Sequence, residues 1–390
     1  MHLLLVGGGH ASLPLLTAAG RLVRRGARVT LLNDVRHLWY SGMVPEHLGG
    51  VYTQAQVTID LARQCAEHGV AFVEERVVAL DAAAQTFTTE SGRTFGCDLA
   101  AIDIGAMNPN RTVSWSTIPT KPLHRIADLV GLLDAVESGG TPQRLVIVGG
   151  GAAGVEVALN VTARLPKARL DVTLIEPSHR LLGAMPEGAA AYCRRLLTER
   201  GVRIRFGHRV GSVLPEGIVL DNGTEIESDA VLWATGSVGP PLFAEAGLPT
   251  DHRGFLRVNA HLQCAAAPWL FAAGDCAVID GAEHLARVGV HAVKQGLTLR
   301  TNLLRISEAA FDGRDLTRLR LDRFRPYPLV PLILSTGTRD GLMVVGERWQ
   351  ANPAMLRLKH AVDRRWIRRY HPEDQFEGLL DAAHAEAVHA

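Results

Sequence analysis

The sequence of 390 residues predicts an α/β fold in which two similar strand–turn–helix units are followed by a small α+β region. The prediction depends on two stretches, LLLVGGGHAS at residues 3–12 and RLVIVGGGAAGVE at residues 144–156. In each, a glycine-rich turn follows a short apolar run, and the residues after the turn have the apolar spacing of a helix. An internal repeat of this kind indicates two copies of one supersecondary unit.

The glycines of such a turn have separate roles in a Rossmann-like, dinucleotide-binding unit. The first makes the tight turn, the second lets the backbone approach a diphosphate, and the third allows the helix to pack closely on the strand. The diphosphate lies where the N–H groups at the start of the helix are free. The three positions are Gly7, Gly9 and Ser12 in the first turn, and Gly149, Gly151 and Gly154 in the second. Two such turns are typical of an enzyme that passes electrons between two cofactors.

The residue that ends the second strand of each unit is expected to bind a ribose hydroxyl. After the second turn, the strand DVTLIE ends at Glu176, which favours NADH because a carboxylate repels the 2′-phosphate of NADPH. After the first turn, the strand RVTLLND ends at Asn33 and Asp34. Alignment of VTLLN with VTLIE puts Asn33 in the equivalent place. The sequence leaves the ribose contact of the first site open between these two residues.

Composition excludes several classes of function. The formal net charge of +1 gives no bulk electrostatic reason to bind nucleic acid. No run of 18 apolar residues is present, so we expect no membrane-spanning helix. The strand expected at Leu3 leaves no room for a signal segment before it, and we expect a cytoplasmic protein. We predict no metal site, and the sequence does not fix the oligomeric state.

The cysteines are scattered and odd in number, which suits a reducing compartment. None forms a CxxC or CxxxxC pair, which argues against a redox-active disulfide between neighbouring cysteines. Cys264 and Cys276 are close enough in sequence to meet, but we favour buried small side chains for both. The five are Cys65, Cys97, Cys193, Cys264 and Cys276.

The order of the predicted elements indicates a discontinuous arrangement of domains. The first domain comprises residues 1–115 and 246–319, the second residues 116–245, and a hairpin with a basic helix fills residues 320–390. The predicted helices cover residues 13–25, 60–69, 153–164 and 189–200, with a further helix from about residue 288. Residues 70–105 alternate like a small antiparallel sheet, and residues 37–53 read as an ordered loop.

Further motifs resemble those of a known protein family. The two turns, WATG at 233–236 and LFAAGDCA at 270–277 resemble the two-dinucleotide-binding flavoproteins. That family includes glutathione reductase, ferredoxin reductases, sulfide:quinone reductases and type II NADH dehydrogenases. YSGMVP at 40–45, KP at 121–122 and RVGVHAVKQG at 287–296 are most similar to the type II NADH dehydrogenase-like branch. That branch is also found fused ahead of selenophosphate synthetase in some bacteria, and no synthetase part is present here.

The resemblance covers nearly the whole chain and implies a glutathione reductase-like fold, with FAD in the first site and NADH in the second. Asp275 is expected to bind the ribityl chain, and Glu156 to lie beside the nicotinamide. Glu156 also has a simpler explanation, as an acid that complements the helix dipole. Lys121 lies either by the flavin or in solvent. The implied FAD contacts are Gly7, Gly9, Ser12, Asn33, Asp34, Pro45, Gly105, Gly274 and Asp275. The implied NADH contacts are Gly149, Gly151, Gly154, Glu176 and Gly236.

The resemblance also implies the reaction: hydride passes from NADH to FAD, and electrons then pass to an acceptor, for which we expect a quinone. Type II NADH dehydrogenases carry a glutamine by the quinone, and here Gly289 and Val290 stand in that place. Sulfide:quinone reductases need a cysteine pair by the flavin, and residues 287–296 contain no cysteine. The alternatives that stay open are a redox-sensing or partner-binding flavoprotein, a sulfide:quinone reductase-like enzyme, and an electron donor to a dedicated protein.

The helix predicted over residues 355–370 is both apolar and basic. It either lies on an anionic membrane surface, on the inner face of the cell membrane, or packs on the protein with solvated arginines, and we favour packing. Its apolar residues are Met355, Leu356, Leu358, Val362, Trp366 and Ile367. Its positive face is expected to consist of Arg357, Lys359, Arg364, Arg365, Arg368 and Arg369.

Overall fold

The computed structural model describes residues 1–108, 121–123 and 126–371, and it divides into two compact units. The first unit comprises Met1–Trp39, Thr58–Met107 and Ser237–Pro328. The second comprises Tyr40–Val57, Asn108–Gly236 and Leu329–Ala390. The chain therefore passes from one unit to the other several times.

The first unit is built on a five-stranded parallel sheet in the order β19-β9-β1-β2-β5. The central strand β1 is covered on both faces, because Leu3, Leu4 and Leu5 are fully buried. A continuous apolar run is what such a strand requires. The strands are β1 (His2–Val6), β2 (Arg28–Asn33), β5 (Ala71–Glu74), β9 (Leu99–Ile102) and β19 (Leu270–Ala272).

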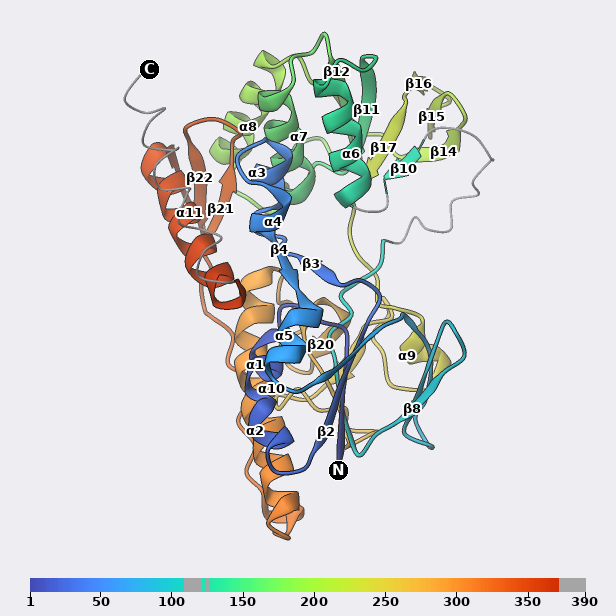
Figure 1. Ribbon diagram of the computed structural model, residues 1–390. Coiled ribbons are helices and arrows are strands. Elements are labelled where there is room, and N and C mark those ends of the chain that lie inside the picture. The colour runs from blue at the N-terminus through green and yellow to red at the C-terminus, as the bar shows by residue number, and fades with distance from the viewer. Residues whose placement is uncertain (109–120, 124–125, 372–390) are drawn as a thin grey trace. The chain divides into compact units, whose positions relative to one another are not determined.

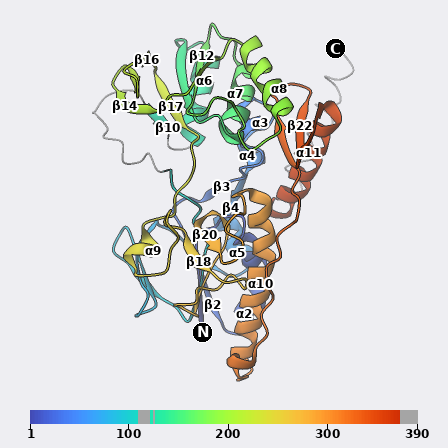
Figure 2. The same cartoon turned by 180° about the vertical axis from the view of Figure 1, so that it is seen from behind.

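Helices pack beside this sheet. The helix predicted over residues 13–25 forms as two short pieces, α1 (Leu13–Ala18) and α2 (Gly20–Val23). Gly20 lies at the break, and glycine is unfavourable in the interior of a helix. The long α10 (Gly289–Phe311) lies alongside both pieces, as Figure 1 shows, and Figure 2 shows α10 beside α2 from the opposite side. The unit also contains α5 (Leu61–Glu67), α9 (Leu242–Glu245), and the short 3-10 helices η2 (Gly274–Cys276) and η3 (Leu316–Arg318).

The small antiparallel sheet predicted over residues 70–105 forms in part. Its middle folds as an antiparallel sheet, β6-β7-β8, whereas the flanking β5 and β9 join the parallel sheet instead. The strands are β6 (Val77–Asp81), β7 (Thr86–Thr89) and β8 (Thr94–Gly96). Two further pairs complete the unit: β3 (His37–Trp39) with β4 (Thr58–Asp60), and β18 (Leu256–Val258) with β20 (Ala277–Ile279).

The second unit repeats the plan with a parallel sheet in the order β10-β17-β11-β12-β13. Its strands are β10 (Lys121–Leu123), β11 (Gln143–Val148), β12 (Leu170–Glu176), β13 (Arg203–Phe206) and β17 (Ala230–Trp233). Its helices are α6 (Ile126–Glu137), α7 (Ala152–Arg164) and α8 (Glu187–Glu199), of which α7 and α8 lie close to the predicted bounds. An antiparallel sheet of β14 (Val210–Leu214), β15 (Gly217–Leu220) and β16 (Glu225–Glu227) packs its apolar side on this sheet.

The C-terminal region belongs to the second unit rather than standing apart. The expected hairpin has a third strand, so that β21 (Leu332–Ser335), β22 (Gly341–Val345) and β23 (Arg348–Asn352) form an antiparallel sheet. The helix α11 (Pro353–Ile367) packs on this sheet and ends in the 3-10 turn η4 (Arg368–Tyr370). Figure 1 shows α11 beside β21 and β22.

Residues 40–57 also belong to the second unit, although the sequence places them within the first domain. The expected ordered loop contains two short helices, α3 (Val44–Leu48) and α4 (Gln54–Val57). The helix α3 packs against α7, which carries the second glycine turn. Among the residues that the structure describes, no helix is both long and apolar enough to cross a membrane.

Candidate functional site

The two glycine turns have the same backbone geometry. The N–H of Gly7 donates to the carbonyl of Leu32 at 2.8 Å, and the N–H of Gly149 donates to the carbonyl of Ile175 at 2.8 Å. Both glycines have a positive φ, +91° and +114°. A side chain at either place would overlap the carbonyl of the residue after the neighbouring strand. The first glycine of each turn is therefore required, and the repeat inferred from sequence is present at the level of single hydrogen bonds.

The second turn retains an open face. A Cβ at Gly151 would have nothing within 4 Å, whereas a Cβ at Gly154 would overlap the carbonyl of Gly149. Glu176, at the end of β12, accepts the N–H of Gly150 at 2.7 Å on Oε2 and the N–H of Ser178 at 2.8 Å on Oε1. The turn thus has the space that a diphosphate needs above its second glycine and a fixed carboxylate at the strand end, which together fit a dinucleotide.

The first turn has an amide in the place of that carboxylate. Asn33 Oδ1 accepts the N–H of Gly8 at 2.8 Å, as Glu176 does for Gly150, while Asp34 is exposed one residue later. Asn33 is therefore the structural equivalent of Glu176. Ser12, in the third glycine position, is buried, and its Oγ has no hydrogen-bond partner among the described residues.

The segment expected to hold the ribityl chain lies in the same unit as the first turn. Gly274 has a φ of +71°, and its N–H donates to Gln295 Oε1 on α10 at 2.7 Å. Asp275 follows it in η2, where burial raises the pKa of its carboxyl and the charge of Arg287 opposes that rise. Gly105 has a φ of +67° and open space where a side chain would lie. The open space at Gly105 and the carboxyl group of Asp275 fit the ribityl part of FAD.

Three of the expected site residues have a different setting. Pro45 lies buried in α3 of the second unit, whereas the other expected FAD contacts belong to the first. Gly236 is exposed in the loop after β17. Lys121 begins β10, and its side chain lies outside the part of the chain that the structure describes.

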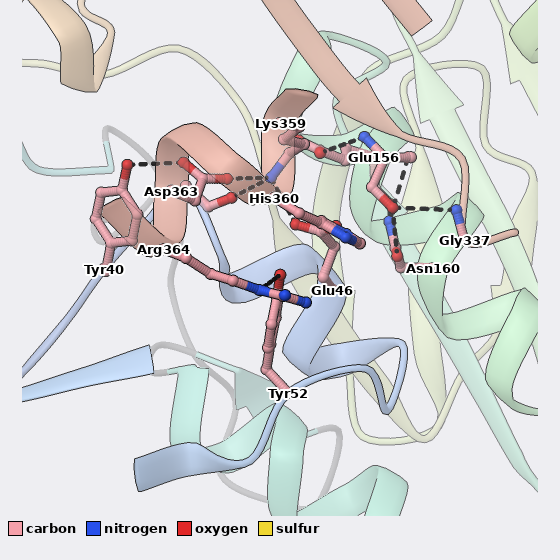
Figure 3. A network of polar contacts seen from close by, with 12 residues as sticks. Tyr40, Glu46, Tyr52, Glu156, Asn160, Gly337, Lys359, His360, Asp363 and Arg364 are labelled. Atoms are coloured by element: carbon pink, nitrogen blue, oxygen red, sulfur yellow. Dashed lines mark hydrogen bonds and ion pairs between the residues drawn. The ribbon is translucent and has the colours of Figure 1, made fainter. Parts of the chain in front are cut away.

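Glu156, the expected neighbour of nicotinamide, lies buried on α7. Its Oε1 accepts the backbone N–H of Ser335 at 2.7 Å, and the side chain of Ser335 donates to Asn160 Oδ1 at 3.0 Å (Figure 3). Burial raises the pKa of Glu156 to about 7, against the opposing charge of Lys359. The carboxyl group can therefore gain or lose a proton near neutral pH.

Lys359 is the functional candidate that sequence reasoning missed. Its Nζ donates to Glu46 Oε2 at 2.6 Å, to Asp363 Oδ2 at 2.9 Å and to the carbonyl of Gly42 at 2.5 Å (Figure 3). Only 6% of the residue is exposed. Burial alone would lower the pKa of Lys359, but the surrounding carboxylates, Glu46 first among them, raise it above its usual value.

Further polar side chains extend this network. His360 Nε2 contacts Glu46 Oε1, and Tyr40 donates its hydroxyl to Asp363 Oδ1 at 2.8 Å. Burial raises the pKa of Asp363, whereas the bonds to His360 and Lys359 hold the pKa of Glu46 below its usual value despite burial. The buried polar network, by which we mean Tyr40, Glu46, Glu156, Lys359, His360 and Asp363, thus contains carboxyls of opposite tendency around one ammonium group.

The basic helix packs, as favoured, but with a different face inward. Lys359 was assigned to the positive surface and is buried, and Leu358 and Val362 were expected inside and are 44% and 56% exposed. Trp366 is buried and stacks on Tyr40 with ring centroids 4.3 Å apart. The signal that could have found this face is the i, i+4 spacing of Lys359 and Asp363 on the side that also holds Trp366 and Tyr370.

The cysteines and Val290 bear on the redox chemistry that the sequence suggests. All five cysteines are free, and Cys264 and Cys276 are buried, as favoured. Val290, in the place of the quinone-side glutamine, lies in the first turn of α10 and is 41% exposed. Among the described residues no group of His, Cys, Asp and Glu is arranged to hold a metal ion.

Comparison with known proteins gives the class. The family model "Pyridine nucleotide-disulphide oxidoreductase" matches residues 1–296, and the chain belongs to this family of FAD- and NAD(P)-dependent oxidoreductases. The parallel sheets described above give the mixed α/β fold that is expected of this family.

Individual relatives support the family but are distant. The chain is 25% identical over 363 residues to ferroptosis suppressor protein 1 of Taeniopygia guttata, covering 88% of each protein. It is 30% identical over 147 residues to the type II NADH:quinone oxidoreductase of Haemophilus influenzae, covering 35% of this chain and 33% of that protein. The NDH2 structure from Plasmodium falciparum in complex with NADH has a TM-score of 0.75 at 11% identity, covering 95% of this chain and 98% of that one, and shares the fold.

Proposed function

We propose that this protein is an FAD-dependent NADH oxidoreductase that passes electrons from NADH to a quinone. In balanced form, NADH, a proton and a quinone give NAD⁺ and a quinol. FAD, when bound at the first turn, would accept the hydride and return the electrons. The chain's own residues bind the two dinucleotides, exclude water from the buried groups and hold protons.

The observation that carries the proposal is the second turn with Glu176. The carboxylate is held by the N–H groups of Gly150 and Ser178, so it cannot swing away from a ribose. A ribose diol can donate to it, and a 2′-phosphate would meet a fixed negative charge. The nearby Arg180 donates to the carbonyls of Gly183 and Met185, which favours a role in shaping the loop over binding a phosphate. These contacts support NADH over NADPH.

We assign Glu156 and Lys359 to proton handling. Quinone reduction consumes one proton beyond the hydride, and a group with a pKa near neutrality transfers protons best. Glu156, with its pKa near 7, meets that condition, and the charge of Lys359 acts directly on it. Glu46 and Asp363 keep Lys359 charged, so Lys359 is a positioning residue for the charge balance and Glu156 the candidate that exchanges the proton.

The test is anaerobic stopped-flow of the purified protein at the flavin band near about 450 nm, a property of the cofactor. We expect rapid bleaching by NADH, slow bleaching by NADPH, and recovery of the band when a soluble quinone is added. A preparation that cannot be loaded with FAD would contradict the proposal at its base. If NADH bleaches the flavin band but no quinone restores it, the protein oxidises NADH but does not pass the electrons to a quinone.

That last outcome would favour a second candidate, a redox-sensing or partner-binding flavoprotein with little turnover. The observation behind it is Val290, an exposed aliphatic side chain where a quinone-side glutamine is expected. An aliphatic group offers a quinone carbonyl no hydrogen bond. The case for a sulfide:quinone reductase-like reaction is weaker, because none of the cysteines lies in residues 287–296.

We also propose that the protein works in the cytoplasm, and that the face of α11 left exposed by its packing makes peripheral contact with the inner face of the cell membrane. The outward face of α11 exposes Leu358 and Val362 together with the exposed Arg357 and Arg365. A helix of this composition can lie on an anionic bilayer surface. Since Trp366 is buried against Tyr40, the contact would depend on the two aliphatic residues and the arginines.

A further inference from the structure

Asp103 and Ala234 hold equivalent places in the two glycine-turn units. The N–H of Asp103 donates to the carbonyl of Val6 at 2.8 Å, and the N–H of Ala234 donates to the carbonyl of Val148 at 2.8 Å. Each is the first residue after a strand that pairs with the central strand of its sheet, β9 in one case and β17 in the other. One unit therefore has a carboxyl group where the other has a methyl group.

The carboxyl group of Asp103 is bonded to the turn itself. Its Oδ2 accepts the N–H of Ala11 at 2.7 Å and the N–H of Ser12 at 3.0 Å. These positions correspond to Ala153 and Gly154 of the second turn. Backbone N–H groups at this place are those that a dinucleotide diphosphate uses in such a unit. In the first turn they are already engaged by an acid of the protein.

The space above the second glycine of the turn also differs between the two units. A Cβ at Gly9 would lie 2.5 Å from the carboxyl atoms of Asp103, whereas a Cβ at Gly151 would have nothing within 4 Å. The side of Gly274 that faces the turn is also filled by Asp103 Oδ1. Two glycines expected to make room for FAD therefore make room for this carboxyl group, and Asp103 is only 4% exposed.

Among the described residues, the groups that shift the pKa of Asp103 include no positive charge. From η2 the carboxylate of Asp275 repels it, and the thiol of Cys276 stays protonated because burial raises its pKa. In the turn, burial lowers the pKa of His10 to about 4, so its imidazole is neutral above that pH. Burial raises the pKa of Asp103 itself to about 7, with the two N–H bonds acting in the opposite direction.

We propose that Asp103 is a proton-linked determinant of FAD affinity at the first turn: FAD binds together with one proton taken up from solvent by the Asp103 carboxyl. The reason is electrostatic, since a diphosphate that enters a dry site beside a carboxylate meets a like charge, and protonation removes it. A neutral carboxyl can still accept the N–H groups of Ala11 and Ser12. The inference rests on the proposed binding of FAD to this turn.

The experiment measures the FAD dissociation constant of the full-length protein, freed of FAD by dialysis against a chaotropic salt, from pH 6 to pH 9. For the wild type we expect the constant to rise about tenfold per pH unit above the pKa of Asp103, as linkage to one proton requires. For Asp103→Asn, which keeps an accepting oxygen without a charge, we expect tighter binding at pH 9 and no slope. The control is Asp98→Asn, the same change at a side chain that is 64% exposed, which should keep the slope.

A reciprocal variant keeps the inference testable where Asp103→Asn fails to fold. Ala234→Asp places the carboxyl in the second turn, and we expect NADH binding to weaken and to acquire the pH slope. A slope in the wild type that persists unchanged in Asp103→Asn would overturn the inference, as would FAD binding that is independent of pH in the wild type. Failure of the wild type to bind FAD at any pH would instead contradict the proposed function.

Discussion

Lys359 Nζ lies 2.6 Å from Glu46 Oε2, and these side chains are 7% and 0% exposed. The pair joins α11 to α3 within the second unit, across 313 residues of sequence. This contact, with those of Asp363 and His360 beside it, explains why residues 40–57 belong to the second unit. A buried ion pair of this kind is costly to break from one side, because the remaining charge keeps its desolvation penalty.

The first prediction follows from that asymmetry. Lys359→Met leaves the buried carboxylates of Glu46 and Asp363 without their cation, and we expect the free energy of unfolding to fall by about 3–5 kcal/mol. Equilibrium unfolding of the protein in urea measures this change in free energy. The double variant Lys359→Met with Glu46→Gln should recover part of the loss. The exposed Lys167→Met is the control, and an equal loss in that variant would contradict this account.

The second prediction concerns Glu156 and the pH dependence of stability. Its pKa in the folded protein, about 7, lies above the ordinary 4.5, so folding favours the protonated form. The free energy of unfolding should therefore decline as the pH rises from about 4.5 through about 7, by up to about 3 kcal/mol for this group. Glu156→Gln, whose amide oxygen can still accept the N–H of Ser335, should flatten that decline.

Thermal unfolding at a series of pH values gives the comparison. Part of the slope should survive in Glu156→Gln, because Asp103 also has a raised pKa. If the variant shows the same slope as the wild type, Glu156 does not carry the raised pKa. The same variant should slow quinone reduction more than flavin bleaching by NADH, since we assign Glu156 to the proton and not to the hydride.

The third prediction concerns cofactor choice. Glu176→Gln keeps an oxygen for the N–H of Gly150 but removes the charge at the ribose end of β12. We expect the ratio of flavin reduction rates with NADH and NADPH, at limiting concentrations, to fall at least about tenfold, which corresponds to about 1.4 kcal/mol. Asp171→Asn, on the same strand, is the matched control. An unchanged ratio would show that Glu176 does not contact the ribose.

The fourth prediction concerns the outward face of α11. The double variant Leu358→Ser with Val362→Ser removes the two exposed aliphatic side chains while leaving the arginines. We expect sedimentation with vesicles that contain anionic lipid for the wild type and at least several-fold less for the variant. Neither protein should bind purely zwitterionic vesicles. Equal binding of both proteins would assign the interaction to charge alone, and no binding by the wild type would remove the membrane proposal.

The sequence by itself determined the elements that depend on neighbouring residues. The two glycine turns, the strands before them and the strand end at Glu176 follow from local backbone geometry and short-range patterns, and the structure has them close to the predicted bounds. The family assignment, which the comparison confirms, came from the same local motifs. The bounds also held for α7 and α8, since their apolar periodicity is strong.

Only the tertiary structure decided what distant residues do together. It placed Lys359 inside beside Glu46, turned the inward face of α11 from Leu358 and Val362 to Lys359 and Asp363, and set Asp103 against the first turn. The physical reason is that a charged side chain is buried only where partners from other segments compensate its desolvation. Glu46 lies 313 residues from Lys359, and Ala11 and Ser12 lie 92 and 91 residues from Asp103, so no local pattern shows that these groups meet.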